Sequence, residues 1–527
     1  MTNNNNEYDY IIIGSGFGGS VSAYRLTQKG YKVLVLEKGR WFTETTLPKS
    51  NWDFKNWLWA PSIGFRGIMK TTVFQHAGVM SGVGVGGGSL VYGATLPTPK
   101  QKFFTTGSWA MLDDWEKKLA PFYKKALYML GAQENPELTE ADQVIRKLAE
   151  QIDKTDEFKP SKVGIFFAEK GKEGELIEDP YFKGEGPARR GCIQCGGCMT
   201  GCRYNAKNSL DKNYLHLAQQ QGAKIIAETE VVDVKPAGVN DGSEGYLIST
   251  TPLNKKQAEA KVFYSKGVIF AGGVMGTIPL LLKLKKSGSL KNLSSMLGRD
   301  VRTNNESLTS VTSYNDDVDY AKGVTIGSIL NTDENTHLEP ISFNPASSAW
   351  RLILAPKVAA DNFIGRMVQL FQNLYNAPGE NLKILFAKNW SKRTIYLLFM
   401  QHLDSTLSLQ LNRANIVTSK VNDGAAPSSN IPEANYLSDA IEKIMNGKAT
   451  RAITEVFFGT PSTAHILGGA VMGKDETQGV IDKQHRVFNY KNMMVCDGSA
   501  VSANPGVNPS LTITAMTEYA MNQLPNK

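Results

Sequence analysis

The chain has 527 residues, of which 41% are hydrophobic and 20% are charged, and its formal net charge is +8. The chain is longer than one with a single hydrophobic core usually is, so we expect an ordinary globular protein of two interleaved domains. The positive charge is spread along the chain, which predicts no nucleic-acid partner. Residues 1–7 are polar and no apolar stretch is long enough to span a bilayer, so we expect a cytoplasmic protein without a signal peptide.

The first strong signal is a glycine fingerprint directly after a predicted strand. Residues 8–13 are apolar and β-branched, which indicates a buried strand. Gly14, Gly16 and Gly19 then give G-x-G-x-x-G spacing, in which the three glycines serve a tight turn, the approach to a pyrophosphate and helix packing. The N-terminus of the following helix offers free N–H groups to phosphates. We therefore predict a dinucleotide site formed by Gly14, Ser15, Gly16, Phe17, Gly18 and Gly19.

An acidic residue follows the second predicted strand of this unit. Residues 32–36 form that strand and Glu37 closes it, 18 residues after Gly19. A carboxylate here accepts hydrogen bonds from ribose hydroxyls, which favours a cofactor without a 2′-phosphate.

Three further segments are assigned to the same nucleotide-binding unit. A second glycine-rich loop holds Gly86, Gly87, Gly88 and Ser89, where a backbone without side chains can pass close to a flat ring or a diphosphate; a flexible surface loop is the alternative. Residues 228–234 predict a strand whose backbone, at Val232, lines an adenine pocket. Residues 262–270 predict another strand of the same sheet, followed by a small-residue turn and a helix.

Four of the five cysteines fall in one segment with the spacing of a bacterial ferredoxin, and they are Cys192, Cys195, Cys198 and Cys202. In a cytosolic protein this spacing suggests a metal rather than disulfides. Three interpretations stay open: an iron–sulfur cluster, a zinc ion, or unligated reduced thiols. The cluster interpretation is weakened because Arg203, rather than proline, follows the fourth cysteine. A cluster would indicate a dehydrogenase that passes single electrons to a partner, whereas zinc would be a structural clip.

Residues 306–455 differ in character and predict a second domain with an antiparallel sheet. Residues 395–400 are fully apolar, and residues 406–411 alternate between apolar and polar side chains, as in strands. These groups either shape a pocket for a lipophilic substrate or simply form the core of the domain. Bulky apolar and basic residues mix over residues 350–393, which is consistent with peripheral contact with a membrane surface.

The last segment carries a second signature of the nucleotide fold and a candidate base. Asp497-Gly498 and Asn508-Pro509-Ser510 lie about 480 residues after the first fingerprint, so the chain must leave the dinucleotide fold and return to it. Removing a hydride from an alcohol carbon requires a nearby acceptor for the hydroxyl proton. His465 is the natural candidate, since imidazole titrates near neutral pH; the alternative is a hydrogen-bonded core histidine.

The chain resembles the glucose–methanol–choline (GMC) oxidoreductases, and within them the bacterial cholesterol oxidase-like branch. The matching segments are GSGFGG with Glu37, GVGGGSLV at 84–91, KNSLDK at 207–212, AGG at 271–273, His465 with LGG at 467–469, and DGS…GVNPSLTIT at 497–514. The resemblance implies non-covalent FAD, oxidation of an alcohol to a carbonyl, and oxygen or an electron-transfer protein as the acceptor. It also implies that His465 positions the substrate hydroxyl and accepts its proton, and that Asn508 binds the same oxygen and lies against the flavin.

Two departures from the family pattern bear on the substrate. Tyr92 stands where sterol oxidases of this branch usually carry asparagine. A glutamate of the substrate domain, which serves double-bond isomerisation in steroid oxidases, has no identified counterpart, so oxidation is better supported than isomerisation.

We therefore expect an α/β fold in which a Rossmann-like FAD-binding domain is interleaved with an α+β substrate domain built on an antiparallel sheet. The expected boundaries are 1–305 for the main flavin segment with its cysteine-rich insertion at 191–203, 306–455 for the substrate domain, and 456–527 for the return. The expected activity is oxidation of a sterol-like or other lipophilic alcohol. The alternatives are an iron–sulfur flavodehydrogenase of sugars or polyols, and a flavoprotein that binds lipid or senses redox state without turnover.

Overall fold

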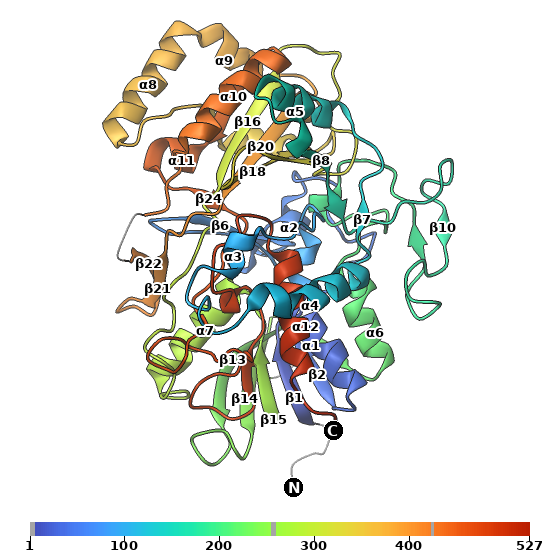
Figure 1. Cartoon of the computed structure of the whole chain (residues 1–527), viewed down its shortest axis with the longest axis vertical. Coiled ribbons are helices and arrows are strands. Elements are labelled where there is room, and N and C mark those ends of the chain that lie inside the picture. The colour runs from blue at the N-terminus through green and yellow to red at the C-terminus, as the bar shows by residue number, and fades with distance from the viewer. Residues whose placement is uncertain (1–5, 254–259, 423–425) are drawn as a thin grey trace.

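The computed structural model of the chain describes residues 6–253, 260–422 and 426–527. Residues 1–5, part of the polar start from which we expect no signal peptide, lie outside the described residues. Figure 1 shows two lobes: the lower one holds both termini and the sheet around β1, and the upper one holds a second sheet and helices α5 and α8 to α11.

The lower lobe is built on a seven-stranded sheet with the strand order β12-β2-β1-β15-β14-β13, and β25 also pairs with β15. The five strands β12, β2, β1, β15 and β25 are parallel, whereas β14 and β13 follow β15 as an antiparallel extension. Their bounds are β1 (Glu7–Ile13), β2 (Val33–Leu36), β12 (Lys224–Ile226), β13 (Thr229–Pro236), β14 (Tyr246–Pro252), β15 (Lys261–Phe270) and β25 (Met493–Val495). Helices α1 (Phe17–Gln28), α4 (Trp115–Met129), α6 (Tyr214–Gln220), α7 (Val274–Ser287) and α12 (Ser510–Asn522) pack around this sheet.

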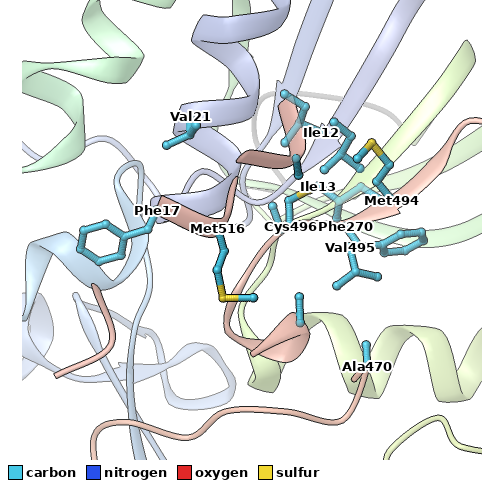
Figure 2. Packing of buried hydrophobic residues seen from close by; sticks show 14 of the residues in the cluster. Ile12, Ile13, Phe17, Val21, Phe270, Ala470, Met494, Val495, Cys496 and Met516 are labelled. Atoms are coloured by element: carbon cyan, nitrogen blue, oxygen red, sulfur yellow. The ribbon is translucent and has the colours of Figure 1, made fainter. Parts of the chain in front are cut away.

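The return of the chain to this sheet is held by apolar packing between strands far apart in the sequence. Figure 2 shows Ile12 and Ile13 of β1 close to Phe270 of β15 and to Met494 and Val495 of β25. All five side chains are buried. Because β-branched and aromatic side chains suit a strand that is covered on both faces, these apolar runs form the centre of the sheet.

The upper lobe is built on a second seven-stranded sheet with the order β19-β23-β16-β20-β18-β17-β8, and all of its pairings are antiparallel. Its strands are β8 (Phe158–Pro160), β16 (Ser307–Ser313), β17 (Ser328–Asn331), β18 (Thr336–Ile341), β19 (Leu354–Pro356), β20 (Thr394–Gln401) and β23 (Gly447–Ala452). The expected combination of a Rossmann-like sheet with an antiparallel sheet is therefore confirmed.

Strand β20, which is apolar from Ile395 to Met400, separates two clusters of buried side chains. Ile395, Leu397 and Phe399 pack with α5 (Glu140–Gln151) and α10 (Pro432–Met445) on one face of the sheet. Tyr396, Leu398 and Met400 belong to a different cluster on the opposite face. Because successive side chains of a strand point to opposite faces, both faces of β20 are covered, one by helices and the other towards the lower lobe.

Three further helices belong to the upper lobe. They are α8 (Phe363–Asn376), α9 (Pro378–Leu385) and α11 (Ile453–Phe458). In Figure 1, α8 and α9 lie at the end of the molecule opposite both termini. A small buried cluster of Val358, Leu370 and Val456 joins α8 to α11.

The alternating segment 406–411 differs from its expected place. It forms β21 (Leu407–Leu411), which pairs with β22 (Val417–Val421) in a separate two-stranded sheet. Leu407 and Leu409 are buried in the large core of the lower lobe, so their alternation reflects packing against that lobe rather than membership of the upper sheet.

A small three-stranded sheet links the two lobes near the cavity described below. It has the order β24-β6-β5, with β5 (Met69–Val73), β6 (Gly78–Gly82) and β24 (Ser462–Thr463). The remaining short elements are α2 (Phe54–Trp57), α3 (Gln101–Phe104), and the paired strands β3 (Trp59–Ala60) with β4 (Phe65–Arg66), β7 (Gln133–Glu134) with β9 (Lys162–Val163), and β10 (Leu176–Ile177) with β11 (Arg189–Arg190).

Candidate active site

One cavity of about 730 Å³ brings together residues from both ends of the chain. The predicted site residues that line it are Gly14, Ser15, Gly16, Phe17, Gly18, Glu37, Gly87, Gly88, Val232, His465, Asp497, Gly498, Asn508, Pro509 and Ser510. Three other predicted cofactor residues, Gly19, Gly86 and Ser89, are buried next to this lining rather than part of it.

The glycine fingerprint has the geometry that a dinucleotide needs. Gly14 has a φ of +102°, and a Cβ there would lie 2.5 Å from the carbonyl oxygen of Ala271. A Cβ at Gly19 would lie 2.1 Å from the carbonyl oxygen of Gly14, so this glycine lets α1 pack against the strand. At Gly16, in contrast, the nearest atom to an added Cβ is 4.0 Å away, and the residue faces the cavity. The backbone at the start of α1 is thus open to a pyrophosphate group.

The second glycine-rich loop packs directly on the fingerprint. A Cβ at Gly87, whose φ is +52°, would lie 2.7 Å from Gly16 Cα. Ser89 Oγ donates a hydrogen bond to the Gly86 carbonyl (2.7 Å) and accepts one from the Leu210 N–H (3.0 Å). Ser89 and Gly86 therefore hold the shape of the loop, while Gly87 makes its contact with the fingerprint possible.

Glu37 lies at the carboxyl end of β2, where a ribose is expected. Its Oε2 accepts hydrogen bonds from the Ser15 N–H (3.1 Å) and Oγ (2.7 Å), and its Oε1 accepts one from the Gly39 N–H (2.8 Å). A carboxylate oxygen has two lone pairs, so the Glu37 side chain can accept further hydrogen bonds from ribose hydroxyls. Val232, on β13, lines the same cavity.

Asp497 joins the returning segment to the start of α7. Its Oδ2 accepts hydrogen bonds from the Gly273 N–H (2.8 Å) and Thr277 Oγ1 (2.5 Å), and its Oδ1 accepts one from the Ser499 N–H (2.7 Å). Burial raises the pKa of Asp497 above its ordinary value, and these hydrogen bonds oppose the effect. The aspartate thus fixes Gly498, which also lines the cavity, beside the small-residue turn after β15.

His465 and Asn508 lie side by side, with 3.5 Å between His465 Nε2 and Asn508 Nδ2. On the far side of the imidazole, His465 Nδ1 lies 2.6 Å from Glu306 Oε1. A carboxylate only accepts hydrogen bonds, so the proton of neutral His465 is on Nδ1 and the lone pair is on Nε2. This tautomer suits a group that accepts a proton at Nε2.

The electrostatic surroundings of His465 favour its protonated form. Burial disfavours the imidazolium, but the charge and hydrogen bond of Glu306, and the charge of Glu339, outweigh burial and raise the pKa of His465 above its ordinary value. The imidazolium that forms after proton transfer is therefore stabilised by a carboxylate already in place.

Asn508 is held by a second buried carboxylate. Its Nδ2 donates a hydrogen bond to Glu339 Oε2 (3.1 Å), and Glu339 Oε1 in turn lies 2.9 Å from His337 Nε2. Within the described part of the chain, Asn508 Oδ1 is buried without a hydrogen-bond partner. Since buried polar atoms are normally satisfied, this oxygen is available to a bound molecule, and the site fits a cofactor or substrate that contacts Asn508.

Sequence reasoning missed both glutamates. Glu306 immediately precedes β16 and Glu339 is in β18, and neither belongs to a recognisable motif. No counterpart of a substrate-domain glutamate was identified from the sequence, because only the pairing of the strands shows which residues reach His465 and Asn508. The sequence offers one signal, which is that Glu306 ends a run of polar residues, Thr303-Asn304-Asn305-Glu306.

Apolar side chains of the upper lobe line the same cavity as His465. They include Met199, Ile326, Ile341 of β18 and Leu398 of β20. Tyr92 also lines it, but its hydroxyl donates to the Asn208 carbonyl (3.1 Å), and burial raises the pKa of Tyr92. The tyrosine that replaces asparagine thus presents its ring to the cavity while its hydroxyl is already bound elsewhere.

The four clustered cysteines lie around one small enclosed space, but the structure gives no support to a metal there. The space lined by Cys192, Cys195, Cys198 and Cys202 amounts to about 10 Å³, which is roughly the room of one water molecule. Among residues 6–253, 260–422 and 426–527, no group of three or more His, Cys, Asp or Glu side chains is placed to hold a metal ion.

The packing of the cysteine segment explains why the structure gives no support to a metal there. Cys198 is buried in an apolar cluster with neighbours such as Val163 and Ile165. Burial raises the pKa of the Cys195 thiol to about 11 and raises those of Cys192 and Cys198 as well, which disfavours their thiolate forms. Of the three interpretations that the ferredoxin-like spacing left open, neither the iron–sulfur cluster nor zinc is supported.

In the part of the chain that the structure describes, every helix is too short or too polar to cross a membrane.

Comparisons with known proteins agree with this architecture. Family models described as GMC oxidoreductase match residues 188–302 and 414–517, and a model described as NAD(P)-binding Rossmann-like domain matches residues 12–45. A cholesterol oxidase of Acinetobacter baumannii is 42% identical over 539 residues, covering 100% of this chain and 96% of that protein. A cholesterol oxidase of Mycobacterium tuberculosis is 40% identical, covering 99% of this chain and 92% of that protein.

Solved structures share the fold at lower sequence identity. A formate oxidase is similar with a TM-score of 0.62 and 12% identity, covering 98% of this chain and 97% of that one. A pyridoxine 4-oxidase from Mesorbium loti is similar with a TM-score of 0.59 and 14% identity, covering 98% of each chain.

Proposed function

This chain belongs to the GMC oxidoreductase family and is an FAD-dependent oxidoreductase acting on CH–OH groups, and we propose that its substrate is a sterol-like or other lipophilic alcohol. The observation that carries this proposal is the position of His465 and Asn508 in one cavity with the glycine fingerprint and with apolar side chains of the upper lobe. The high identity to two cholesterol oxidases over the full chain supports the same substrate class.

We assign the binding of FAD to the residues that line the cavity in the lower lobe. Gly14, Gly16 and the start of α1 would hold the pyrophosphate, Glu37 the ribose, and Val232 the adenine. Gly87 and Gly88 on one side and Pro509 and Ser510 on the other would border the flavin ring. When bound, FAD supplies the hydride acceptor.

The protein side of the reaction is a proton transfer. His465 Nε2 accepts the proton of the substrate hydroxyl while the carbinol carbon loses its hydride, and the alcohol becomes a carbonyl. Asn508 Nδ2 gives one hydrogen to Glu339 and directs the other towards His465 Nε2, 3.5 Å away, where the same substrate oxygen would receive it instead. Glu306 stabilises the resulting imidazolium. We further assign oxygen as the final electron acceptor, in line with the names of the relatives.

Peroxide release from a panel of alcohols tests the proposal. We expect the flavin-loaded enzyme to release peroxide with cholesterol and with long-chain alcohols dispersed in detergent, at a kcat/KM far above that for glucose or glycerol. His465→Ala is the control for peroxide that arises without the active site. A higher kcat/KM for the sugar or the polyol would overturn the lipophilic assignment.

The same preparation tests the alternative of an iron–sulfur flavodehydrogenase. Iron, zinc and acid-labile sulfide are measured after anaerobic purification, together with flavin. Iron and acid-labile sulfide in a near 1:1 ratio to each other, beside one flavin per chain, would favour a dehydrogenase that passes electrons to a partner, and would replace oxygen as the proposed acceptor.

A further inference from the structure

Helix α8 carries apolar side chains on two different sides. On its inner side, Met367 and Leu370 pack towards Val358 and Val456. Its outer side carries a second stripe at spacings of four, three and four residues, which places the stripe on one helix face. The stripe consists of Ile364 (74% exposed), Val368 (48%), Phe371 (68%) and Tyr375 (86%).

The exposed stripe continues onto helix α9 and the residue that follows it. Leu382, Leu385 and Phe386 are 56%, 42% and 73% exposed, and Phe363 at the start of α8 is 58% exposed. We call the set Phe363, Ile364, Val368, Phe371, Tyr375, Leu382, Leu385 and Phe386 the apical patch. Single exposed apolar residues are ordinary, but eight of them on α8, on the contacting helix α9 and on the residue after α9 mark an interaction surface.

The charges around the apical patch indicate what covers it. Arg366, the one charged residue of α8, is buried and donates hydrogen bonds to the carbonyl oxygens of Val456 (3.0 Å) and Asp361 (2.6 Å). The outer face of α8 is therefore uncharged. Lys383 and Lys388 lie exposed beside the α9 part of the patch, and the one acidic residue of α9, Glu380, lies 3.9 Å from Lys448 Nζ. An apolar ridge with aromatic side chains and flanking lysines is the pattern of a helix that lies in the interface of a bilayer with anionic lipids.

We propose that the apical patch inserts into the interfacial region of a lipid bilayer that contains anionic phospholipids. This inference names a lipid bilayer as the partner of the proposed enzyme. It rests on the proposed function in one respect: a lipophilic alcohol would be dissolved in such a bilayer, which would then be the source of the substrate. The patch lies at the end of the molecule opposite both termini (Figure 1), so the flavin lobe would face away from the membrane.

The patch is connected to the catalytic segment through one short helix. Helix α11 lies beneath α8, joined to it by the Arg366 hydrogen bond and the Val456 packing. From α11 the chain runs through β24 directly to His465. Docking at the bilayer would thus place α8 and α9 against the source of the substrate, with α11 between α8 and the segment that carries His465.

Vesicle co-sedimentation of the flavin-loaded full chain tests the proposal without using activity. The vesicles consist of phosphatidylcholine with phosphatidylglycerol and contain neither sterol nor any other alcohol substrate. We expect the triple variant Ile364→Ser, Phe371→Ser, Tyr375→Ser to lower the bound-to-free ratio at least about ten-fold, because each lost apolar side chain removes part of the inserted area. The matched control is Met111→Ser, Val239→Ser, Val262→Ser, three exposed apolar residues outside the patch, and it should bind like the wild type.

A second variant pair tests the choice of an anionic bilayer. Lys383→Gln with Lys388→Gln should weaken binding to phosphatidylglycerol-containing vesicles and leave binding to pure phosphatidylcholine vesicles unchanged. Flavin content and circular dichroism confirm that each variant is folded.

Three outcomes would overturn the proposal: a wild type that does not sediment with the vesicles, a triple variant that binds as the wild type does, or a wild-type dimer that the triple variant converts to a monomer. The last outcome would make the patch an interface between two copies of the chain. Failure of the proposed function is separate: vesicle binding without oxidation of either detergent-dispersed sterol or long-chain alcohols would refute the substrate class and leave the docking site standing.

Discussion

Glu306 holds both the ring of His465 and the backbone that carries it. Its Oε1 lies 2.6 Å from His465 Nδ1 and accepts a hydrogen bond from Thr463 Oγ1 (3.1 Å), while its Oε2 accepts one from the Ala464 N–H (3.0 Å). The His465 N–H itself donates to Thr463 Oγ1 (2.9 Å). One buried carboxylate therefore sets the tautomer, the orientation and the charge stabilisation of the candidate base.

The first prediction concerns the pH dependence of the Glu306→Gln variant. The neutral form of His465 is the base, so wild-type activity is lost as the pH falls through the raised pKa of His465. Removing the negative charge lowers that pKa, so the acid limb of kcat/KM moves to lower pH. The plateau falls at least about ten-fold, because the imidazolium loses its partner. The measurement is a pH profile of kcat/KM.

The Glu306→Asp variant keeps the charge and is the control for that shift. Its acid limb should stay near that of the wild type even if its plateau is lower. An unchanged profile for Glu306→Gln would mean that Glu306 does not set the protonation of His465.

The second prediction separates catalysis from flavin binding. His465→Ala should lower kcat about 100- to 10,000-fold, the usual contribution of a general base, while the bound FAD remains near one per chain. Single-turnover reduction of the flavin under anaerobic conditions measures the step directly. Wild-type reduction rates in the variant would remove His465 from the mechanism.

The third prediction concerns the contact between the two glycine-rich loops. Gly87→Ala places a Cβ 2.7 Å from Gly16 Cα at a residue with a φ of +52°, so one of the two loops must move. We expect loss of most of the bound FAD, measured by absorbance after gel filtration. Gly78→Ala is the matched control, since its Cβ would find no atom nearer than 3.8 Å among the described residues, and it should retain the cofactor.

The fourth prediction is a pH-dependent stability effect at Glu455 of α11. Burial raises the pKa of this carboxyl from 4.5 to about 7. Between these values the unfolded state loses its proton first, so the group's contribution to stability falls as the pH rises, by on the order of 3 kcal/mol in total. Glu455→Gln removes the titration. The variant should therefore gain thermal stability relative to the wild type as the pH rises from 4.5 to 7.

Thermal unfolding midpoints across this pH range check the effect. Glu150→Gln, at an exposed position of α5, is the control and should give a difference from the wild type that does not vary with pH. A constant difference for Glu455→Gln would show that Glu455 ionises normally in the folded protein.

The order of strands and turns in the nucleotide fold was predictable because each is marked by residues close together in the sequence. Gly14 follows an apolar strand, Glu37 ends the next one, and Asp497 follows the apolar run that becomes β25. Tight turns and close approaches between backbone segments require glycine at particular positions of such a fold, so these positions can be recognised in the sequence. The return of the chain is confirmed by the parallel pairing of Val268 with Met493.

The second half of the catalytic centre was not predictable, because it depends on strand register. Glu339 reaches Asn508 only because β18 pairs with β20 in one register, and a shift by one residue would turn it to the other face of the sheet. Whether the four cysteines can hold a metal also depends on packing that the sequence does not show. Their spacing shows that they gather, but not that Cys198 packs into an apolar cluster that leaves little space between the thiols.

The pairing of β25 with β15 also fixes the order in which the protein can be completed during synthesis. A Cβ at Gly18 would lie 1.4 Å from the carbonyl oxygen of Cys496, so the end of β25 lies directly on the first turn of α1. The whole upper lobe is translated between these two contacts. A growing chain that has already made its glycine fingerprint therefore lacks this contact until the ribosome has passed residue 496, and we expect FAD to bind only to the nearly finished polypeptide.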